Sequence, residues 1–351
     1  MRKQYAEKDK MKILGIETSC DETAMAVVEI DGGEVIVKSN IVSSQIATHA
    51  QYGGVVPKLA AREHLENIRK VYETACQDNS YDLIAVTNGP GLAPALLIGV
   101  TFARTMAWKY DKPIVGVDHM AGHIYSNWLT ANNHAFPALN LLASGGHTEL
   151  VIMTAHNKFE IIGETLDDAV GEAFDKVARM LNLEYPGGPA ISRIAKDGNP
   201  LAYPLPEPMK RSAGLNFSYS GLKTAVLYLI RNITGEDREL TESEQADVAA
   251  SFQRVAVESL ISKTRVAIAR HNPQSLMLSG GVSANTLLRE EIKKLGAELD
   301  LPIYIPDIAY TGDNGAMIAV AGYFAYKSGV QDQWGSLAID ANLRLGHNLK
   351  A

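Results

Sequence analysis

Two histidines four residues apart, His119 and His123, are the side chains whose type and spacing point most directly to chemistry. They follow an apolar stretch at 113–117 (PIVGV), which predicts a strand, and they open a predicted helix. Residues four apart on a helix share one face and are separated by a rise of about 6 Å, so both imidazoles can reach one ion. The pair predicts a metal site that still needs a third ligand.

Asp313 is the best third ligand, because the strand-then-helix unit recurs before it. The stretch 302–307 (PIYIPD) repeats the Pro-Ile-x-x-x-Asp spacing of 113–118, and a second predicted helix opens around Asp313. An aspartate at a helix start can instead be an N-cap that accepts backbone N–H bonds. If a pseudo-two-fold axis relates the two units, their helix starts face each other. Two imidazoles and one carboxylate with open positions would suit Fe(II) or Zn(II).

Composition indicates a globular protein of two domains. The 351 residues are 46% hydrophobic and 21% charged, and no apolar run is long enough to span a membrane. Residues 1–10 lack the apolar segment of a signal peptide, so we expect a flexible extension, with Met11 as a second possible start. Cys20 and Cys76 are the only cysteines and form no Cys-x-x-Cys motif, which favours a reducing cytoplasm over a disulfide framework.

The formal net charge of −7 argues against a protein that binds nucleic acid over its whole surface. Local basic patches are still compatible with this charge. The candidates lie on one predicted helix and around a Pro-rich loop at 204–220, where the alternative is ordinary solvated surface: Arg62, Arg69, Lys70, Lys210, Arg211 and Lys223.

The order of predicted elements repeats along the chain. A strand, polar turn and strand at 13–28 is followed by a strand, Gly-rich turn and helix at 83–110, and then by the His119 unit. A second hairpin at 139–153 surrounds Gly145 and Gly146, which let backbone amides approach a phosphate or carboxylate. A helix with an acidic face is predicted at 165–181, further helices at 222–230 and 242–270, and a strand, Gly loop and helix at 276–295.

This duplicated α/β design resembles the ASKHA fold of actin, sugar kinases and Hsp70-type ATPases, which hold a nucleotide between two lobes. The resemblance implies one lobe at 11–133 plus 318–351 and a second at 134–317, separated by a cleft. The fold alone would permit a kinase or an ATPase.

More specific motifs resemble those of the TsaD family. They are 15–23 (GIETSCDET), 52–57 (YGGVVP), 119–123 (HMAGH), 144–148 (SGGHT), 217–224 (FSYSGLKT), 279–285 (SGGVSAN) and 313–316 (DNGA). The resemblance implies a cytoplasmic enzyme that transfers threonylcarbamoyl from L-threonylcarbamoyl-adenylate to the N6 amine of adenosine 37 in tRNAs reading ANN codons, releasing AMP. It also implies two partners, a TsaB-like paralogue and a TsaE-like ATPase, and no membrane association.

The resemblance also implies roles for individual residues. One divalent ion, Fe(2+) or alternatively Zn(2+), would be held by His119, His123 and Asp313. The adenylate would be bound by Ala143, Ser144, Gly145, Gly146, His147, Asp175, Gly188 and Asn285. We expect it to lie over four glycines where a side chain would collide with it: Gly145, Gly146, Gly280 and Gly281.

Asp21 or Glu22, in the first polar turn, could accept the proton of the attacking amine. The sequence departs from the family pattern at two places. Ala93-Pro94-Ala95 stands where the family usually has a small Gly-Ser pair, and Ser192 stands where an acidic residue is frequent.

Three other functions compete with this interpretation. A kinase or ATPase of the same fold would need a magnesium-binding carboxylate and would not need His119 and His123. A metalloprotease is disfavoured because no glutamate follows the first histidine as in His-Glu-x-x-His. A pure scaffold would tolerate loss of both histidines.

Overall fold

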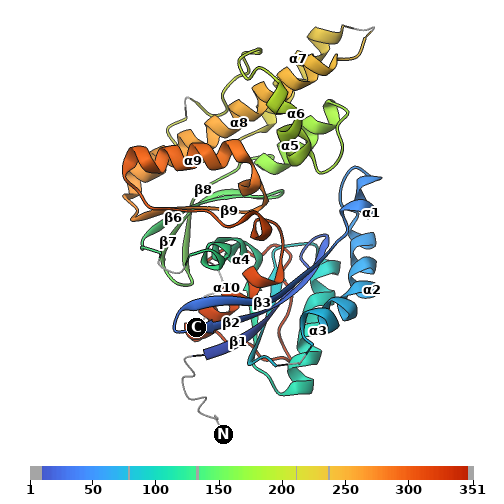
Figure 1. The fold of residues 1–351 in the computed structure, drawn as a ribbon, viewed down its shortest axis with the longest axis vertical. Helices are drawn as coiled ribbons and strands as arrows, with labels where there is room; N and C mark the ends of the chain where they lie inside the picture. Colours follow the sequence, from blue (N-terminus) through green and yellow to red (C-terminus); the bar gives the residue numbers. More distant parts are fainter. Residues whose placement is uncertain (1–9, 78–79, 132–133, 211, 236–237, 347–351) are drawn as a thin grey trace.

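The computed structural model describes residues 10–77, 80–131, 134–210, 212–235 and 238–346, which form two five-stranded sheets flanked by helices (Figure 1). The first sheet contains β1 (Lys10–Glu17), β2 (Glu22–Asp31), β3 (Glu34–Ser44), β4 (Leu83–Gly89) and β5 (Ile114–Asp118). The second sheet contains β6 (Ala138–Ala143), β7 (Thr148–Ala155), β8 (Lys158–Glu164), β9 (Ser275–Ser279) and β10 (Ile303–Tyr304). Of the extension expected at 1–10, all but Lys10, the first residue of β1, lies outside the described residues.

Both sheets have the same topology. The first runs β3-β2-β1-β4-β5, and the second, read in the equivalent direction, runs β8-β7-β6-β9-β10. In each, the first three strands form an antiparallel meander, while the fourth and fifth are added in parallel. The duplication and the ASKHA-type α/β fold expected from the sequence are therefore confirmed. The third strand of each meander, β3 and β8, was not predicted; both are only half buried, which weakens their apolar pattern.

The helices form layers on both sides of each sheet. They are α1 (Ile46–Ala50), α2 (Pro57–Ala75), α3 (Ala93–Tyr110), α4 (His119–Tyr125), α5 (Val170–Met180), α6 (Gly187–Ile194), α7 (Ser220–Thr234), α8 (Glu242–His271), α9 (Thr286–Leu299) and α10 (Gly315–Lys327). α2 and α3 pack on the outer face of the first sheet, and α8 and α9 on the outer face of the second (Figure 1). α4 and α10 lie between the sheets and pack against each other.

We call the first sheet with α1–α3 and α10 the first lobe, and the second sheet with α5–α9 the second lobe. The lobe limits given above in residue numbers stay a prediction. One apolar cluster fills the space between the sheets around α4 and α10, and each outer helical layer has a cluster of its own. None of the described helices combines the length and the apolar character needed to cross a membrane.

The helix predicted at 165–181 is wrong at its start, because α5 begins only at Val170. The cause is Asp167, whose carboxylate accepts a hydrogen bond from the Ser218 hydroxyl at 2.5 Å and another from the Tyr219 backbone N–H at 2.8 Å. Thr165 also forms a bridge with Phe217. These contacts hold residues 165–169 in a bent, non-helical conformation against the end of the long Pro-rich loop.

The close approach of α10 to β1 depends on Gly15. A Cβ atom at this position would overlap the Gly315 carbonyl oxygen and would lie 2.6 Å from the Ala319 backbone nitrogen. Both obstructing atoms belong to backbone, which cannot rotate away as a side chain can. The inner helix could not sit at this depth with a larger residue on the strand.

We therefore expect Gly15→Ala to lower the free energy of unfolding by about 1–3 kcal/mol or more, through forced separation of strand and helix. Urea denaturation would measure the loss. Gly335→Ala is the matched control, because no heavy atom lies within 4 Å of a Cβ there. Equal denaturation midpoints for the two variants would contradict this account of the packing.

Candidate functional site

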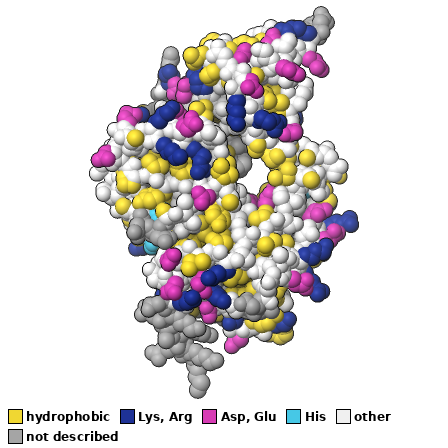
Figure 2. Space-filling model, in the orientation of Figure 1, with side chains coloured by type: hydrophobic (Ala, Val, Ile, Leu, Met, Phe, Trp, Pro, Cys, Tyr) yellow, Lys and Arg dark blue, Asp and Glu magenta, His cyan; other side chains and the backbone are white. Residues whose placement is uncertain are grey.

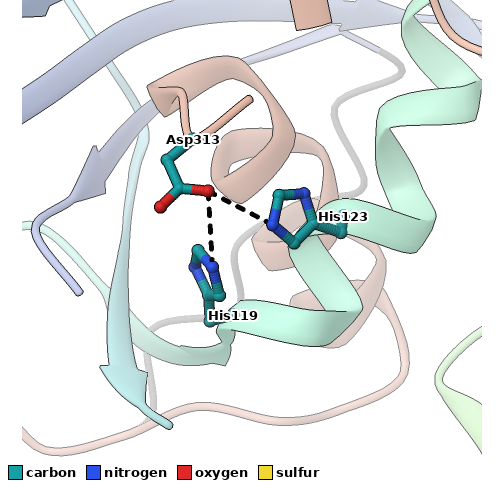
Figure 3. A group of neighbouring side chains, drawn as sticks. All are labelled: His119, His123 and Asp313. Atoms are coloured by element: carbon teal, nitrogen blue, oxygen red, sulfur yellow. Dashed lines mark ion pairs between the residues drawn. The ribbon is translucent and has the colours of Figure 1, made fainter. Parts of the chain in front are cut away.

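The predicted metal ligands meet between the two sheets. α4 begins immediately after β5, and the Asp118 carboxylate caps it by accepting from the Met120 and Ala121 backbone N–H groups. The Nε2 atoms of His119 and His123 lie 3.5 and 3.2 Å from one carboxylate oxygen of Asp313 (Figure 3). Possible ligand atoms of these three residues all lie within 4.8 Å of one another. The structure thus contains a possible His/His/Asp metal site.

Asp313 is not the N-cap of the following helix, so the alternative role considered for it is wrong. Asn314 takes that place, since its side-chain oxygen accepts from the Met317 backbone N–H at 3.0 Å. The Asp313 carboxylate therefore turns toward the histidines instead.

Glu17, at the end of β1, holds His119 from the opposite side. Its fully buried carboxylate accepts from His119 Nδ1 at 2.8 Å and from the Thr87 hydroxyl at 2.6 Å, and it also binds the Ser19 backbone N–H. Because Nδ1 faces Glu17, Nε2 is the ring nitrogen that faces Asp313 and is left to coordinate a metal ion beside it. A carboxylate behind a metal-binding histidine is a common arrangement that fixes the ring and raises its basicity.

The charges of this cluster depend on one another. Burial disfavours charge on His119, but Glu17 and Asp313 outweigh burial and raise the pKa of His119 to about 10. Burial likewise opposes ionisation of Asp313, yet His119 and His123 hold the pKa of Asp313 down to about 2. The fully buried carboxylate of Glu17 and the partly buried carboxylate of Asp313 thus favour positive charge between them. A divalent cation meets that demand, and two imidazole nitrogens with one carboxylate oxygen are a donor set suited to Fe(II) or Zn(II).

A cleft of about 680 Å³ opens beside these ligands. It brings together nearly all the site residues predicted from the sequence: Asp21, Glu22, His119, His123, Ser144, Gly145, Gly146, His147, Asp175, Gly188, Asn285 and Asp313. Ala143 is the exception, because it is fully buried at the end of β6, behind the cleft wall. Figure 2 shows the hollow between the two lobes from one side.

The four glycines expected under the adenylate fall into two classes. At Gly145, Gly146 and Gly281 an added Cβ would meet no heavy atom within 4 Å, and all three line the cleft. Gly280 does not line it, which corrects the expectation for this residue. Its φ of +86°, and the overlap that a Cβ there would make with the Ala143 carbonyl oxygen, make glycine a backbone requirement there.

Titratable groups in the cleft are strongly perturbed. Burial, reinforced by the charges of Asp313 and Asp21, raises the pKa of Glu22 to about 9. Burial, with the charges of His119 and His123, lowers the pKa of His147 to about 4, so this imidazole is neutral at physiological pH. Burial also raises the pKa of Asp175, although that carboxylate accepts a 2.7 Å bond from the Gly187 N–H.

The two departures from the family pattern have clear local structures. Pro94 occupies the first turn of α3, where proline is tolerated because its missing N–H would have no helical partner. Ser192, on α6, lines the cleft and is hydrogen-bonded to Gln253 and Asn285.

The basic residues considered for nucleic-acid contact are mostly paired with acids. The pairs are Arg62–Glu66, Arg69–Glu73, Lys210–Glu207 and Lys223–Asp168. Arg211 lies outside the described residues. Local pairing reduces the positive potential that these side chains could present to phosphates.

Two duplicated sheets enclosing a cleft define an ASKHA-type protein, and solved structures agree. The chain resembles HypF from T. kodakarensis with a TM-score of 0.60 and 16% identity, covering 91% of this chain and 48% of that one. Full-length HypF in a phosphate- and nucleotide-bound form gives a TM-score of 0.56, at 15% identity over 92% of this chain and 47% of that one. These likenesses concern the fold alone.

Sequence comparisons specify the family. The family model for TsaD, tRNA N6-adenosine threonylcarbamoyltransferase, matches residues 36–320. The chain is 44% identical to the protein of that name from Thermosipho africanus, over 97% of this chain and all of the relative. It is 47% identical to the one from Bacillus subtilis, over 93% of this chain and 94% of the relative. The chain therefore belongs to the tRNA N6-adenosine threonylcarbamoyltransferase family, which confirms the resemblance noted from the motifs.

We expect a His119→Ala, His123→Ala double variant to lose its divalent ion, because a single carboxylate remains. Glu17→Gln should keep the shape of the site but weaken metal affinity about 10- to 100-fold by removing the charged partner of His119. Metal content after gel filtration and competition with a chelator would measure both effects. His271→Ala, at an exposed helix end, is the control and should bind metal normally. Full occupancy in the double variant would rule out this site.

Proposed function

We propose that the chain transfers the threonylcarbamoyl group of L-threonylcarbamoyl-adenylate to the N6 amine of adenosine 37 in tRNAs that read ANN codons, with release of AMP. The observation that carries the proposal is the convergence in one cleft of the His/His/Asp cluster, the Gly145–Gly146 turn and the acidic turn at Asp21 and Glu22, in a member of this family. Neither the relatives nor the buried histidine pair favours the alternative of an ATPase or small-molecule kinase.

The reaction needs the cleft mainly to position its reactants. The amine nitrogen attacks the carbamoyl carbon, a C–N bond forms, the bond from that carbon to the phosphate oxygen breaks, and AMP leaves with the electron pair. An aromatic exocyclic amine is a weak nucleophile, so holding it near the carbon accounts for much of the rate. We place the adenylate over Gly145, Gly146 and Gly281, where the cleft has room. Ser144, His147, Asp175, Gly188 and Asn285 would surround it, with Ala143 supporting the turn from behind.

His119, His123 and Asp313 would hold one divalent ion, Fe(2+) in our proposal with Zn(2+) as the alternative. Such an ion supplies Lewis-acid polarisation of an oxygen and a fixed positive charge. Glu17 keeps the His119 ring oriented for this task.

Asp21 and Glu22 are the proposed acceptors of the amine proton. Both line the cleft, and Glu22 also accepts a 3.0 Å bond from the Ser44 hydroxyl. Burial and the charge of Asp313 raise the pKa of Glu22, so this carboxyl group keeps its own proton and cannot accept another unless that charge is offset. With this charge offset by a divalent ion bound at Asp313, the pKa of Glu22 would fall, so that Glu22 could lose its own proton and then accept the proton of the amine.

We further propose that the enzyme acts in the cytoplasm with a TsaB-like paralogue and a TsaE-like ATPase, and without a membrane. The formal net charge of −7 and the pairing of basic residues such as Arg62 and Arg69 with glutamates support this proposal, because a partner protein would then have to supply part of the surface that binds tRNA.

The decisive experiment is transfer from purified L-threonylcarbamoyl-adenylate to tRNA by the metal-loaded full chain, with its partners. A tRNA with guanosine at position 37 is the substrate control. Modified adenosine in the first tRNA and none in the second is the expected result. Nucleotide hydrolysis that needs no tRNA, without transfer, would instead support an ATPase.

Gly146→Val tests the placement of the adenylate. A Cβ at Gly146 would meet no heavy atom within 4 Å, so we expect folding to be nearly unaffected, while the valine side chain occupies volume assigned to the ligand. We expect transfer and adenylate affinity to fall by at least about 100-fold, typical of a buried steric block worth several kcal/mol. Calorimetry and thermal denaturation would measure the two effects, with Gly335→Val as control. Unchanged affinity in Gly146→Val would place the ligand elsewhere.

Binding of tRNA should depend on the partners. We expect the isolated chain to bind weakly, and the complex to bind tightly with an affinity that falls steeply between about 50 and 200 mM salt. Substitution of one phosphate-binding lysine or arginine should reduce the log–log slope by roughly one unit. Fluorescence anisotropy across this salt range, with and without partners, measures both properties. Tight binding by the chain alone would contradict the expectation.

A further inference from the structure

Gln253, which sequence reasoning did not single out, connects two residues of the cleft wall. Its side-chain oxygen accepts from the Ser192 hydroxyl at 2.9 Å and from Asn285 Nδ2 at 2.8 Å. Asn285 Nδ2 also donates to the Ser192 oxygen at 3.0 Å. Ser192 lies on α6, Gln253 on α8 and Asn285 at the start of α9, so this triad joins three helices of the second lobe.

The direction of these hydrogen bonds is fixed by the backbone. The Asn285 side-chain oxygen accepts from the Leu288 N–H at 3.0 Å and so caps α9, which forces its NH₂ group to face the triad. Gln253 must then present its oxygen to the Asn285 NH₂ group, and the Ser192 hydroxyl, which accepts from that NH₂ group, donates to the same oxygen. The Leu288 N–H therefore determines the orientation of both side-chain amides, that is, which of their atoms is oxygen and which is nitrogen.

This arrangement uses the polar side-chain hydrogens of Ser192 and Asn285 within the triad. An asparagine NH₂ has two hydrogens, and here one goes to Ser192 and one to Gln253. The single hydroxyl hydrogen of Ser192 also goes to Gln253. What Ser192 and Asn285 can still offer a ligand is oxygen lone pairs. The side chains of Ser192 and Asn285 can therefore accept hydrogen bonds from a ligand but cannot donate them.

We propose that Gln253 is a positioning and specificity-determining residue, which turns Ser192 and Asn285 into an acceptor-only seat for the ribose hydroxyls of the adenylate. The proposal rests on the proposed function, which places an adenylate in this cleft. It also explains how serine can stand at 192. A carboxylate there would accept hydrogen bonds by its own charge, whereas Ser192 accepts because Gln253 has taken its hydrogen.

The test compares affinities of the metal-loaded full chain for AMP and for its 2′-deoxy-2′-fluoro and 3′-deoxy-3′-fluoro analogues. Fluorine cannot donate a hydrogen bond. We expect the wild-type chain to prefer AMP over at least one analogue by about 10-fold or more, since a site built for a hydroxyl donor rejects a group that lacks the hydrogen. In Gln253→Leu the freed Ser192 hydrogen can turn to the ligand, and the preference should shrink below about 3-fold.

Gln253→Glu is the matched control, because its carboxylate accepts from the same two donors and should preserve the preference. Thermal denaturation reports whether each variant is folded. If Gln253→Leu does not fold, Ser192→Ala removes one acceptor directly and should also reduce the preference.

The outcomes separate the two proposals. Absence of AMP binding by the wild-type chain would overturn the proposed adenylate site, and this inference with it. AMP binding without discrimination against either analogue, or a wild-type preference in folded Gln253→Leu or Ser192→Ala, would overturn the role of Gln253 alone.

Discussion

Two carboxylates on opposite sides of one buried imidazole set the main constraint on this structure. Glu17 contacts Nδ1 of His119, and Asp313 faces its Nε2. A buried ionised carboxylate is expensive unless it is paired, so neither acid can stay charged without the histidines or a cation between them. Removal of positive charge from this cluster would leave the costs of burial uncompensated. A metal centre meets the constraint, and it does so at the point where the two lobes are packed together.

The duplicated topology explains why the ligands meet there. In each half, a helix follows the fifth strand of the sheet and enters the layer between the sheets, giving α4 in the first half and α10 in the second. His119 and His123 lie on α4. Asp313 comes directly before Asn314, the N-cap residue of α10. The glycine at position 15 permits the depth of this packing. Both the fold and the site therefore depend on the position of α10, and a substitution that moves α10 away from β1 would also move Asp313 relative to the histidines.

Local patterns predicted which residues lie together in the cleft better than they predicted the limits of the elements. The histidine pair, the repeat that contains Asp313 and the glycine turn could all be recognised in the sequence, because helical spacing and the order of strands and turns are properties of short segments. The late start of α5 was not, since Asp167 is held by Ser218 and Tyr219, about fifty residues away. The roles of Glu17 and Gln253 escaped for the same reason: their partners are joined to them by folding, and a single sequence carries no signal for such pairs.

Away from the base of the cleft, the two lobes are joined by a weaker contact than those at the base. Opposite the α4–α10 layer, the guanidinium of Arg179 on α5 donates to the Gly53 carbonyl in the loop after α1, which connects the second lobe to the first. Arg179 is exposed, so solvent can replace this bond at little cost, and Gly53 adopts a φ of +68° that glycine accepts readily. The base of the cleft, by contrast, is sealed by buried apolar helices and the charged cluster. The two lobes are therefore held together more firmly at the base of the cleft, where the possible metal ligands lie, than by the exposed Arg179–Gly53 contact.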